Sequence, residues 1–334
     1  MRSLSLAVPK KKAEPIRRRL LAEGVLRKDL HIQSDSKHVY LPVNQRVDLG
    51  YPVDTRDFKE LEENITDYRV LVDVPEDLRA QLPSSFDVVG SIAIVKMSDE
   101  ALPYARAIGK AIMATQKSVR TVCLDSGVVD QYRTRGVKVI AGEETTETTH
   151  KEYGLLFKMD ISKVFFSPRL STERETVANQ VQPGEVVVDM FAGIGPFSLM
   201  IAGSRSPRVI YAIDVNPDAV GYLKENIVAN KAERVVPVLG DAREELAKLE
   251  KADRIIMNLP HSAWDFLPGA IRSLKPGGTI HYFEIMEESD LERRLGEMSD
   301  VAVGEGRVLK VLARRRVKSY SPTMGFFAFD LSFL

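Results

Sequence analysis

A ten-residue segment, VVVDMFAGIG at positions 186–195, constrains the fold more strongly than any other part of the chain. Its three consecutive valines predict a buried parallel strand that ends at Asp189. Gly193 and Gly195 allow a sharp turn that approaches a ligand closely, because glycine has no Cβ. The apolar run from Pro196 to Ala202 then predicts a helix. A strand, a glycine turn and a helix form the first half of a nucleotide-binding βαβ unit.

The turn lacks the third glycine of the dinucleotide fingerprint, since Pro196, Phe197 and Ser198 follow Gly195. Pro196 also removes an N–H group from the helix N-terminus, where a pyrophosphate needs donors. The pattern therefore favours a ligand that places no phosphate on this turn, and S-adenosylmethionine is such a ligand. Its sulfur is cationic and its amino acid end is zwitterionic, so we expect Asp189 to face that end. The alternative is a tight turn that binds nothing, and the spacing of the following strands argues against it.

Two further acidic residues follow predicted strands. The strand Arg208–Asp214 ends about 20 residues after Gly195, at the position where a carboxylate binds both ribose hydroxyls. Asp241 follows the strand Val235–Leu239, and an acid at this position commonly lies beside the adenine amino group in proteins that bind this cofactor. Capping of the next helix is the alternative role for Asp241, and the two roles are compatible.

The fourth predicted strand begins at Arg254 and ends in Asn258, Leu259 and Pro260. Ligands of open α/β sheets bind at the carboxyl ends of the strands, so Asn258 should face the same crevice as Gly193. An asparagine at the end of an apolar strand, close to a proline, more often has a defined binding role than none. Its side chain offers a donor and an acceptor, which suits the edge of a nucleic-acid base.

The chain is expected to form three domains. Residues 1–64 predict a small α/β domain, and the lysines and arginines at its start favour a phosphate-binding surface over a merely solvated helix. The end of this segment, Asp54–Asn64, is predicted to be a connector. Residues 65–160 predict an α+β domain with a strand at Arg69–Val74. Residues 161–334 predict a Rossmann-like α/β domain with a mostly parallel sheet and an antiparallel C-terminal strand.

Composition excludes several classes of protein. Lysine plus arginine (47) balance aspartate plus glutamate (47), so the net charge carries no information about partners. The single cysteine, Cys123, excludes an internal disulfide framework, and no Cys/His cluster has the spacing of a metal site. The start of the sequence lacks the apolar segment of a secretion signal, and no run is long enough to span a membrane. We therefore expect a monomeric, cytoplasmic protein without a metal or a membrane contact.

Two other segments carry charged residues with an ordinary structural explanation. Arg133 and Arg135 share one face of an extended segment, because side chains two positions apart point the same way, and an exposed basic strand explains them. Glu173 falls in the first turn of a predicted helix, where a carboxylate interacts favourably with the helix dipole. Local pattern alone therefore assigns no chemistry to these three residues.

Taken together, the ordered motifs resemble those of the archaeal and eukaryotic class of tRNA (guanine-37-N1) methyltransferases, over nearly the whole chain. Each motif is weak alone, and the ordered set is specific. The matching segments are YRTR at 132–135, HKE at 150–152, SPRLSTER at 167–174, DMFAGIGPFS at 189–198, NLP at 258–260 and VKSYSP at 317–322. The resemblance implies a small domain that contacts the tRNA elbow, a middle domain, and a Rossmann-like methyltransferase domain that acts on the anticodon loop.

The resemblance also implies chemical roles that local pattern does not give. It makes Glu173 the general base that removes the N1 proton of guanine, an effect usually worth about 10²–10⁴ in rate. It makes Arg133 the group that stabilises negative charge on guanine O6, and Asn258 the group that holds the base edge. N1 then attacks the methyl group in line and leaves S-adenosylhomocysteine, and the target base must be flipped out to reach the crevice.

Two sets of binding residues are therefore predicted. The predicted S-adenosylmethionine site comprises Asp189, Phe191, Gly193, Gly195, Asp214, Asp241, Asn258 and Pro260. The predicted tRNA-binding residues are Arg133, Arg135, Arg169, Arg174 and Lys318.

Three alternatives stay open at this point. A relative from the wybutosine pathway transfers the aminocarboxypropyl group of the same cofactor to tRNA, and it tends to carry an aromatic residue after the second glycine and an altered Ser-Pro-Arg. Pro196 and Arg169 therefore favour methylation. A Rossmann dehydrogenase would share the turn and Asp214 but requires the missing third glycine. A non-catalytic tRNA-binding protein would keep the basic residues and lose the cofactor site, which retains its expected residues here.

Overall fold

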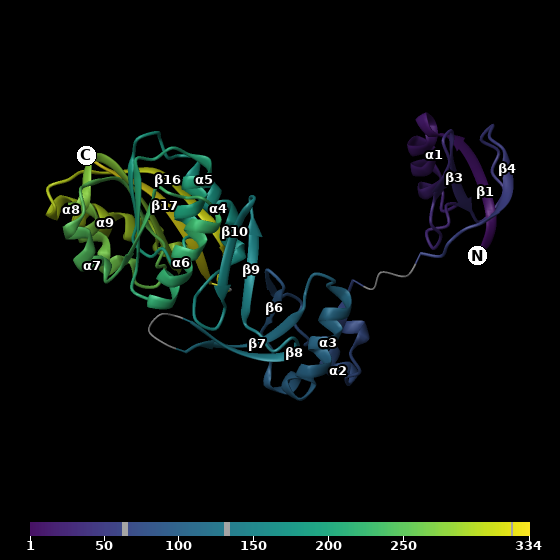
Figure 1. Ribbon diagram of the computed structural model, residues 1–334, viewed down its shortest axis with the longest axis horizontal. Helices are drawn as coiled ribbons and strands as arrows, with labels where there is room; N and C mark the ends of the chain where they lie inside the picture. The colour runs from purple at the N-terminus through teal and green to yellow at the C-terminus, as the bar shows by residue number, and fades with distance from the viewer. Residues whose placement is uncertain (62–65, 130–133, 322) are drawn as a thin grey trace. The chain divides into compact units, whose positions relative to one another are not determined.

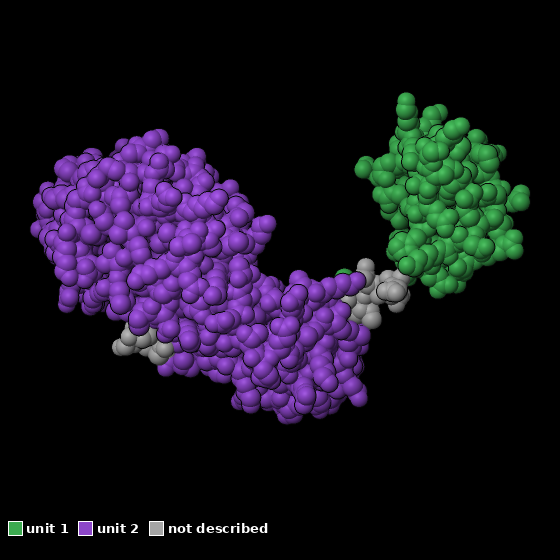
Figure 2. All heavy atoms as spheres, in the orientation of Figure 1, with its two compact units in different colours: residues 1–66 green, residues 67–334 purple. Residues whose placement is uncertain are grey.

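The computed structural model describes residues 1–61, 66–129, 134–321 and 323–334. The chain forms two compact units, Met1–Thr66 and Asp67–Leu334, which Figure 2 shows in different colours. Within the second unit, the predicted division near residue 160 stays a prediction. No helix in the described part of the chain combines the length and the apolar character needed to cross a membrane.

The first unit is a four-stranded antiparallel sheet covered by one helix (Figure 1). Its elements are β1 (Arg2–Pro9), α1 (Lys10–Ala22), β2 (Gln33–Ser34), β3 (His38–Val43) and β4 (Val53–Asp57). The strand order is β2-β3-β1-β4, and Leu20 of α1 packs in one core with Leu6 and Leu41 of the sheet. The connector predicted from Asp54 is wrong at its start, because Val53–Asp57 pairs with β1 as a strand.

The second unit begins with a sheet in the order β5-β6-β7-β8, in which only β6 and β7 are parallel, and a separate hairpin of β9 and β10. The elements of this part are η1 (Tyr68–Leu71), α2 (Glu76–Arg79), β5 (Asp87–Val89), β6 (Ile92–Val95), η2 (Asp99–Tyr104), α3 (Ala105–Thr115), β7 (Thr121–Val128), β8 (Arg135–Gly142), β9 (Glu147–Glu152) and β10 (Leu155–Asp160). The predicted strand at Arg69–Val74 is wrong. The Asp67 carboxylate accepts the backbone N–H of Arg69, and this cap starts a 3₁₀ helix instead.

The rest of the second unit is built on a seven-stranded sheet in the order β13-β12-β11-β14-β15-β17-β16. Its elements are η3 (Pro168–Leu170), α4 (Ser171–Ala178), β11 (Val186–Asp189), α5 (Pro196–Ser204), β12 (Val209–Asp214), α6 (Pro217–Ala229), β13 (Val235–Leu239), α7 (Ala242–Glu245), η4 (Leu246–Lys248), β14 (Ala252–Met257), η5 (Ala263–Phe266), α8 (Leu267–Ser273), β15 (Leu274–Glu287), η6 (Glu288–Asp290), α9 (Leu291–Gly304), β16 (Leu309–Ser319) and β17 (Met324–Phe333). Strands β11 to β15 are parallel, and β17 runs antiparallel to both of its neighbours. This confirms the predicted α/β, Rossmann-like architecture.

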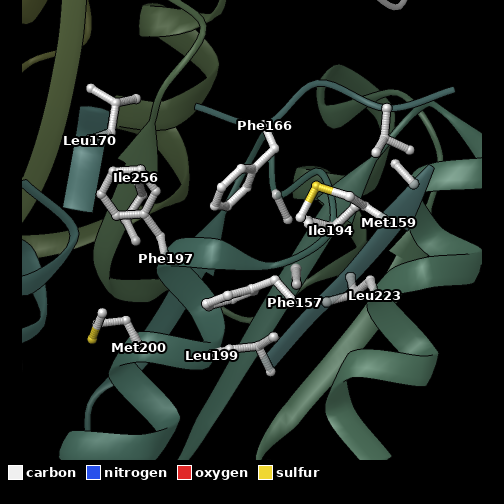
Figure 3. Close-up of a cluster of buried hydrophobic side chains, with 14 of the residues drawn as sticks. Phe157, Met159, Phe166, Leu170, Ile194, Phe197, Leu199, Met200, Leu223 and Ile256 are labelled. Carbon is white, nitrogen blue, oxygen red and sulfur yellow. The ribbon is translucent and has the colours of Figure 1, made fainter. Parts of the chain in front are cut away.

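Helices cover both faces of this sheet. One face packs against α4, α5, α6 and the β9–β10 hairpin, in a core that includes Phe157, Phe166, Phe197 and Leu223. Figure 3 shows these side chains gathered in one cluster with Ile194 of the glycine turn. The opposite face packs against α7, α8 and α9. The glycine turn therefore rests on a closely packed apolar core, which fixes its position at the end of β11.

The register of the sheet places four residues in one row across adjacent strands. Asp189 of β11 pairs with Ile256 of β14, Ile256 pairs with His281 of β15, and His281 pairs with Asp330 of β17. Directly paired residues point to the same face of a sheet. The row therefore lies under the helix layer that contains α4 and α5, at the carboxyl end of β11.

Candidate active site

The glycine turn after β11 has the backbone geometry that the sequence predicts. Gly193 and Gly195 have φ values of 55° and 91°, which favour glycine. A Cβ on Gly195 would lie 2.5 Å from Cδ1 of Leu223, so the turn also needs glycine for close packing. The N–H of Gly193 donates to Oδ2 of Asp214 at 2.6 Å, which ties the turn to the end of β12. Phe191 in the turn packs edge-on against Phe266, with the ring centroids 4.9 Å apart.

Asp189 is a fully buried carboxylate with one unsatisfied oxygen. Ser198 donates a hydrogen bond to Oδ2 at 2.8 Å, whereas Oδ1 has no partner among the residues that the structure describes. Burial, with the nearby charge of Asp214, raises the pKa of Asp189 to about 7. A buried carboxylate oxygen without a partner suits a ligand that brings its own positive charge. The residues at this turn therefore fit a sulfonium cofactor with an ammonium group.

Asp214 and Asp241 are held by the backbone at the ends of their strands. Asp214 accepts N–H groups from Gly193 and from Asn216, the latter at 2.9 Å, and burial raises its pKa. Asp241 caps α7 by accepting the N–H of Arg243 at 2.8 Å, which is the structural role foreseen for it. Each carboxylate oxygen has a second lone pair, so these bonds leave capacity for a ligand. The predicted contacts with ribose and adenine stay predictions.

Asn258 and Pro260 follow β14 at the same edge of the sheet. Because Asp189 pairs with Ile256, Asn258 lies two residues beyond the row that Asp189 begins. Asn258 is half-buried, and the carbonyl oxygen of Pro260 accepts the N–H of Ile285 at 3.1 Å. This bond anchors the Asn-Leu-Pro segment to the end of β15. The amide of Asn258 is thereby placed on a fixed segment at the carboxyl edge, as the sequence predicts.

Glu173 lies in the first turn of α4 and is only 7% exposed. Its Oε2 accepts hydrogen bonds from Nη2 and Nε of Arg315, at 3.2 and 3.3 Å. Arg315 also donates from Nη1 to Oδ2 of Asp330 at 2.6 Å, and Asp330 belongs to the same row as Asp189. The structure therefore holds Glu173 over the face of the sheet that carries Asp189. Sequence reasoning missed Arg315, because it stands in a run of three arginines that no pattern separates.

Arg174, the next residue of α4, has a different environment from the one we predicted. It is 1% exposed and forms two hydrogen bonds with the Glu152 carboxylate, at 2.8 and 2.5 Å. It also donates to the carbonyl oxygen of Ser167 at 3.2 Å and lies over the ring of Phe166. A buried guanidinium with these partners has no surface for a phosphate. The predicted direct contact of Arg174 with tRNA is therefore wrong for this conformation, and Arg174 instead anchors the start of α4.

Three other predicted tRNA-binding residues gather around one carboxylate, Asp87 of β5. Arg169 is exposed and donates to Asp87 at 2.6 Å, and Arg135 lies 3.7 Å from the same carboxylate. Burial and the nearby charge of Arg169 lower the pKa of Lys318. The structure thus brings together side chains from η3, β8 and β16, which we call the Asp87 basic cluster (Arg135, Arg169 and Lys318 with Asp87). Arg133, predicted to contact both guanine and tRNA, lies outside the described residues.

Elsewhere in the described part of the chain, no group of three or more His, Cys, Asp or Glu side chains has the arrangement of a metal site. Cys123 is buried, and its pKa is raised to about 11 by burial, so it is a protonated thiol at neutral pH.

Three models of known protein families match separate segments of the chain. The model of the TRM5/TYW2 methyltransferase domain matches residues 148–306. The models of the TYW2 N-terminal domain and of the tRNA methyltransferase 5 N-terminal domain match residues 69–145 and 6–49.

Comparisons with individual proteins cover the chain from end to end. The tRNA (guanine(37)-N(1))-methyltransferase Trm5b of Pyrococcus abyssi is 42% identical over 330 residues, which cover 98% of each chain. The crystal structure of Trm5b from Pyrococcus abyssi matches with a TM-score of 0.81 at 41% identity and covers 99% of each chain.

Two further solved structures carry ligands. The complex of aTrm5 with tRNALeu matches with a TM-score of 0.78 at 33% identity, over 99% of this chain and 100% of that one. Methanocaldococcus jannaschii Trm5 in complex with adenosine matches with a TM-score of 0.66 at 34% identity, over 99% of each chain. By its family models and by its full-length similarity to Trm5b, the chain belongs to the TRM5/TYW2 family and, within it, to the tRNA (guanine-37-N1)-methyltransferases.

Proposed function

We propose that the chain transfers the methyl group of S-adenosylmethionine to N1 of guanosine 37 in tRNA, with Glu173 as the general base. The observation that carries this proposal is the placement of two carboxylates at one edge of the sheet. Asp189 is buried and has one oxygen without a hydrogen-bond partner among the described residues. Glu173 bonds Arg315, and Arg315 also bonds Asp330, which lies in the same row of the sheet as Asp189. The first carboxylate suits a cationic cofactor, and the second suits removal of a proton.

The residues at the glycine turn fit S-adenosylmethionine, which when bound supplies an electrophilic methyl group on a sulfonium. Asp189 holds the positive charge at the methionine end, because its Oδ1 is buried without a hydrogen-bond partner among the described residues. Gly193 and Gly195 let the backbone approach the ligand. Asp214 binds the ribose and Asp241 the adenine edge. Phe191, Asn258 and Pro260 complete the predicted cofactor site.

The base chemistry falls to residues outside the glycine turn. Glu173 removes the N1 proton of guanine, and such a step usually contributes about 10²–10⁴ in rate. Asn258 holds the base edge with its amide, which offers both a donor and an acceptor. Arg133 stabilises the negative charge that develops on O6, as its family motif implies. The flipped base enters from the carboxyl edge of the sheet, between Asn258 and Glu173.

The nucleic-acid partner is tRNA, as in the aTrm5 complex with tRNALeu. We propose that the anticodon loop binds at the Asp87 basic cluster, because Arg135, Arg169 and Lys318 supply three positive charges there, beside the carboxylates of Asp87 and Asp125. The elbow is proposed to bind the first unit. There the exposed Lys10, Lys11 and Lys12 begin α1, whereas Arg17, Arg18 and Arg19 form ion pairs with Glu14 or Glu23.

Two broader properties complete the proposal. The enzyme acts as a monomer, because one chain carries the cofactor site, the base and the basic cluster. It acts in the cytoplasm, where a lone buried thiol such as Cys123 stays reduced.

Aminocarboxypropyl transfer is the competing reaction, and the Trm5 N-terminal match at residues 6–49 favours methylation. The test is to incubate the purified full-length protein with S-adenosylmethionine and an unmodified tRNA transcript that carries guanosine 37. Digestion and mass spectrometry then identify the modified nucleoside. We expect 1-methylguanosine. A product with the mass of an aminocarboxypropyl adduct would overturn the proposal, and a transcript with adenosine 37 serves as the control.

A further inference from the structure

A chain of hydrogen-bonded titratable side chains crosses the large sheet beneath α4, and the proposed mechanism assigns a chemical role only to its first member, Glu173. It begins at Glu173 and runs through Arg315 of β16, Asp330 of β17 and His281 of β15 to Arg254 of β14. His281 and Asp330 are directly paired in the sheet, and Arg254 closes the chain on Glu185 at 2.9 Å. Four adjacent strands thus each contribute one member on the same face.

The hydrogen bonds fix the protonation of the buried histidine. Nη1 of Arg254 lies 2.8 Å from Nε2 of His281, and a guanidinium only donates, so Nε2 accepts. Nδ1 therefore carries the proton and donates to Oδ1 of Asp330 at 2.7 Å. His281 is neutral, which agrees with the lowering of its pKa by burial. Asp330 keeps its negative charge, because His281, Arg315 and Gln180 all donate to it.

Arg315 is shared unequally between two carboxylates. Its two bonds to Asp330 reach both carboxylate oxygens, at 2.6 and 3.2 Å, whereas its two bonds to Glu173 are 3.2 and 3.3 Å and reach the same oxygen, Oε2. Asp330 therefore holds the guanidinium more tightly than Glu173 does. Oε1 of Glu173 is not engaged by Arg315 and stays available for a proton.

We infer that Arg315 is a positioning residue for Glu173, and that Asp330 sets how strongly Arg315 holds it. The inference rests on the proposed role of Glu173 as general base. An arginine paired with Glu173 alone would stabilise the charged carboxylate and weaken it as a base. Because Arg315 is shared with Asp330, its hold on Glu173 is weaker than that of an arginine bonded to Glu173 alone.

The charged and titratable groups around this pair come from every element packed against it. They are Glu173 on α4, Arg315 on β16, Asp330 on β17, His281 on β15, Arg254 on β14 and Glu185 before β11. Arg174, next to Glu173 on α4, is bound to Glu152. Arg315 is therefore the one cation in the described part of the chain that bonds Glu173.

The test measures the single-turnover rate of methyl transfer as a function of pH for Arg315→Gln and Asp330→Asn. Removing the Arg315 charge should move the acid limb of the profile to higher pH, by about one to three units. At a pH below the wild-type limb the rate should therefore fall about tenfold or more, and it should recover at high pH. Asp330→Asn should move the limb to lower pH and lower the high-pH plateau severalfold, because Arg315 then binds Glu173 alone.

Opposite displacements of the two profiles support the inference, because a general loss of structure would lower the rate at every pH. The same direction for both variants, or no displacement, would overturn it. Arg315→Lys keeps the charge and should bring the limb back near its wild-type position, which keeps the test valid if Arg315→Gln folds poorly. KM values for cofactor and tRNA should stay within about twofold of wild type, since neither residue is proposed to touch them.

Two controls separate this inference from the proposed function. Glu173→Gln should lose the chemical step at all pH values, and an unchanged rate there would remove the base assignment itself. Arg272→Gln, on α8, breaks the ion pair of Arg272 with Glu305 at the surface and should leave the pH profile as in wild type. If Glu173→Gln loses activity but the acid limb does not move in Arg315→Gln or Asp330→Asn, the role of Arg315 is overturned and the base assignment of Glu173 stands.

Discussion

Asp189 and Asp330 lie in one row of the seven-stranded sheet, joined through Ile256 and His281 by direct pairing. Three strand spacings separate them, which amounts to about 14 Å. Asp189 stands at the end of this row that is proposed to face the cofactor, and Asp330 bonds Arg315, which bonds Glu173, at the other end. A rigid sheet therefore sets the separation between the methyl donor site and the proposed base, whereas residues on loops would leave it variable.

The first prediction concerns the pH dependence of stability. Burial raises the pKa of Asp189 to about 7, while an unfolded aspartate titrates near pH 4. The ligand-free folded protein therefore binds this proton first as the pH falls. From this group, the free energy of unfolding should decrease as the pH rises from about 4 to about 7, by at most about 4 kcal/mol in total, and should level off above pH 7. Urea unfolding from pH 5 to pH 8 measures it.

Asp189→Asn provides the comparison for that experiment, since it removes the titrating group. The difference in the free energy of unfolding between wild type and variant should therefore change as the pH rises to about 7 and stay constant above it. Asp300→Asn, at an exposed position of α9, should show a constant difference. A constant difference for Asp189→Asn as well would contradict the raised pKa.

The second prediction concerns cofactor affinity. S-adenosylmethionine brings a positive charge, and the charged form of Asp189 attracts it. Affinity should therefore increase as the pH rises through about 7, by up to about tenfold for each pH unit below that value. S-adenosylhomocysteine lacks the sulfonium charge and should show a smaller dependence. Isothermal titration calorimetry at pH 6, 7 and 8 measures both, and equal slopes for the two ligands would refute a contact between Asp189 and the sulfonium.

The third prediction concerns Arg174, which the structure buries against Glu152. Arg174→Ala should lower the free energy of unfolding by about 3–5 kcal/mol, because it leaves the Glu152 carboxylate buried without its partner. Arg169→Ala, the exposed counterpart in the same motif, should cost no more than about 1 kcal/mol. Urea unfolding followed by circular dichroism measures both. Equal effects of the two substitutions would mean that Arg174 is not an anchor of α4.

Much of the predicted cofactor site could be located from the sequence alone. Asp189, Gly193 and Asp214 end or follow strongly apolar strands, so the periodicity that predicts the strands also places these residues at one edge. Asn216, which Pro217 follows, likewise caps α6 as its residue type favours, and its side chain accepts the N–H groups of Asp218 and Ala219. Here the local signal and the tertiary fold agree.

The environment of Glu173, the proposed general base, cannot be predicted from local sequence. The buried position of Arg174 and the half-buried position of Arg315 depend on partners 22 residues and 15 residues away in the chain, Glu152 and Asp330. Arginine in a basic motif is usually exposed, so pattern alone predicts the surface for both. The strand predicted at Arg69–Val74 is wrong for a related reason, because one capping carboxylate overrides an apolar pattern.

The fourth prediction concerns the first unit, which is compact on its own. Deleting residues 1–66 should weaken tRNA binding and reduce its salt dependence, because the lysines at the start of α1 no longer contact phosphates. The affinity for S-adenosylmethionine should not change, since the residues proposed to bind it all belong to the second unit. Filter binding at several salt concentrations measures the first effect and calorimetry the second. A truncated protein with full tRNA affinity would exclude the first unit from tRNA binding.

The fifth prediction concerns tRNA binding by the Asp87 basic cluster. Arg169→Ala should weaken tRNA binding and lower the slope of log affinity against log salt by about 1, as the loss of one phosphate contact requires. Asp87→Asn should strengthen binding, because it removes the negative charge that pairs with Arg169 and one of the two that pair with Arg135. Arg272→Gln, an exposed arginine on α8, is the matched control and should change neither quantity. Filter binding between 50 and about 300 mM salt resolves a slope change of this size. If Asp87→Asn and Arg169→Ala shift the affinity in the same direction, the cluster serves the fold and the anticodon loop binds elsewhere.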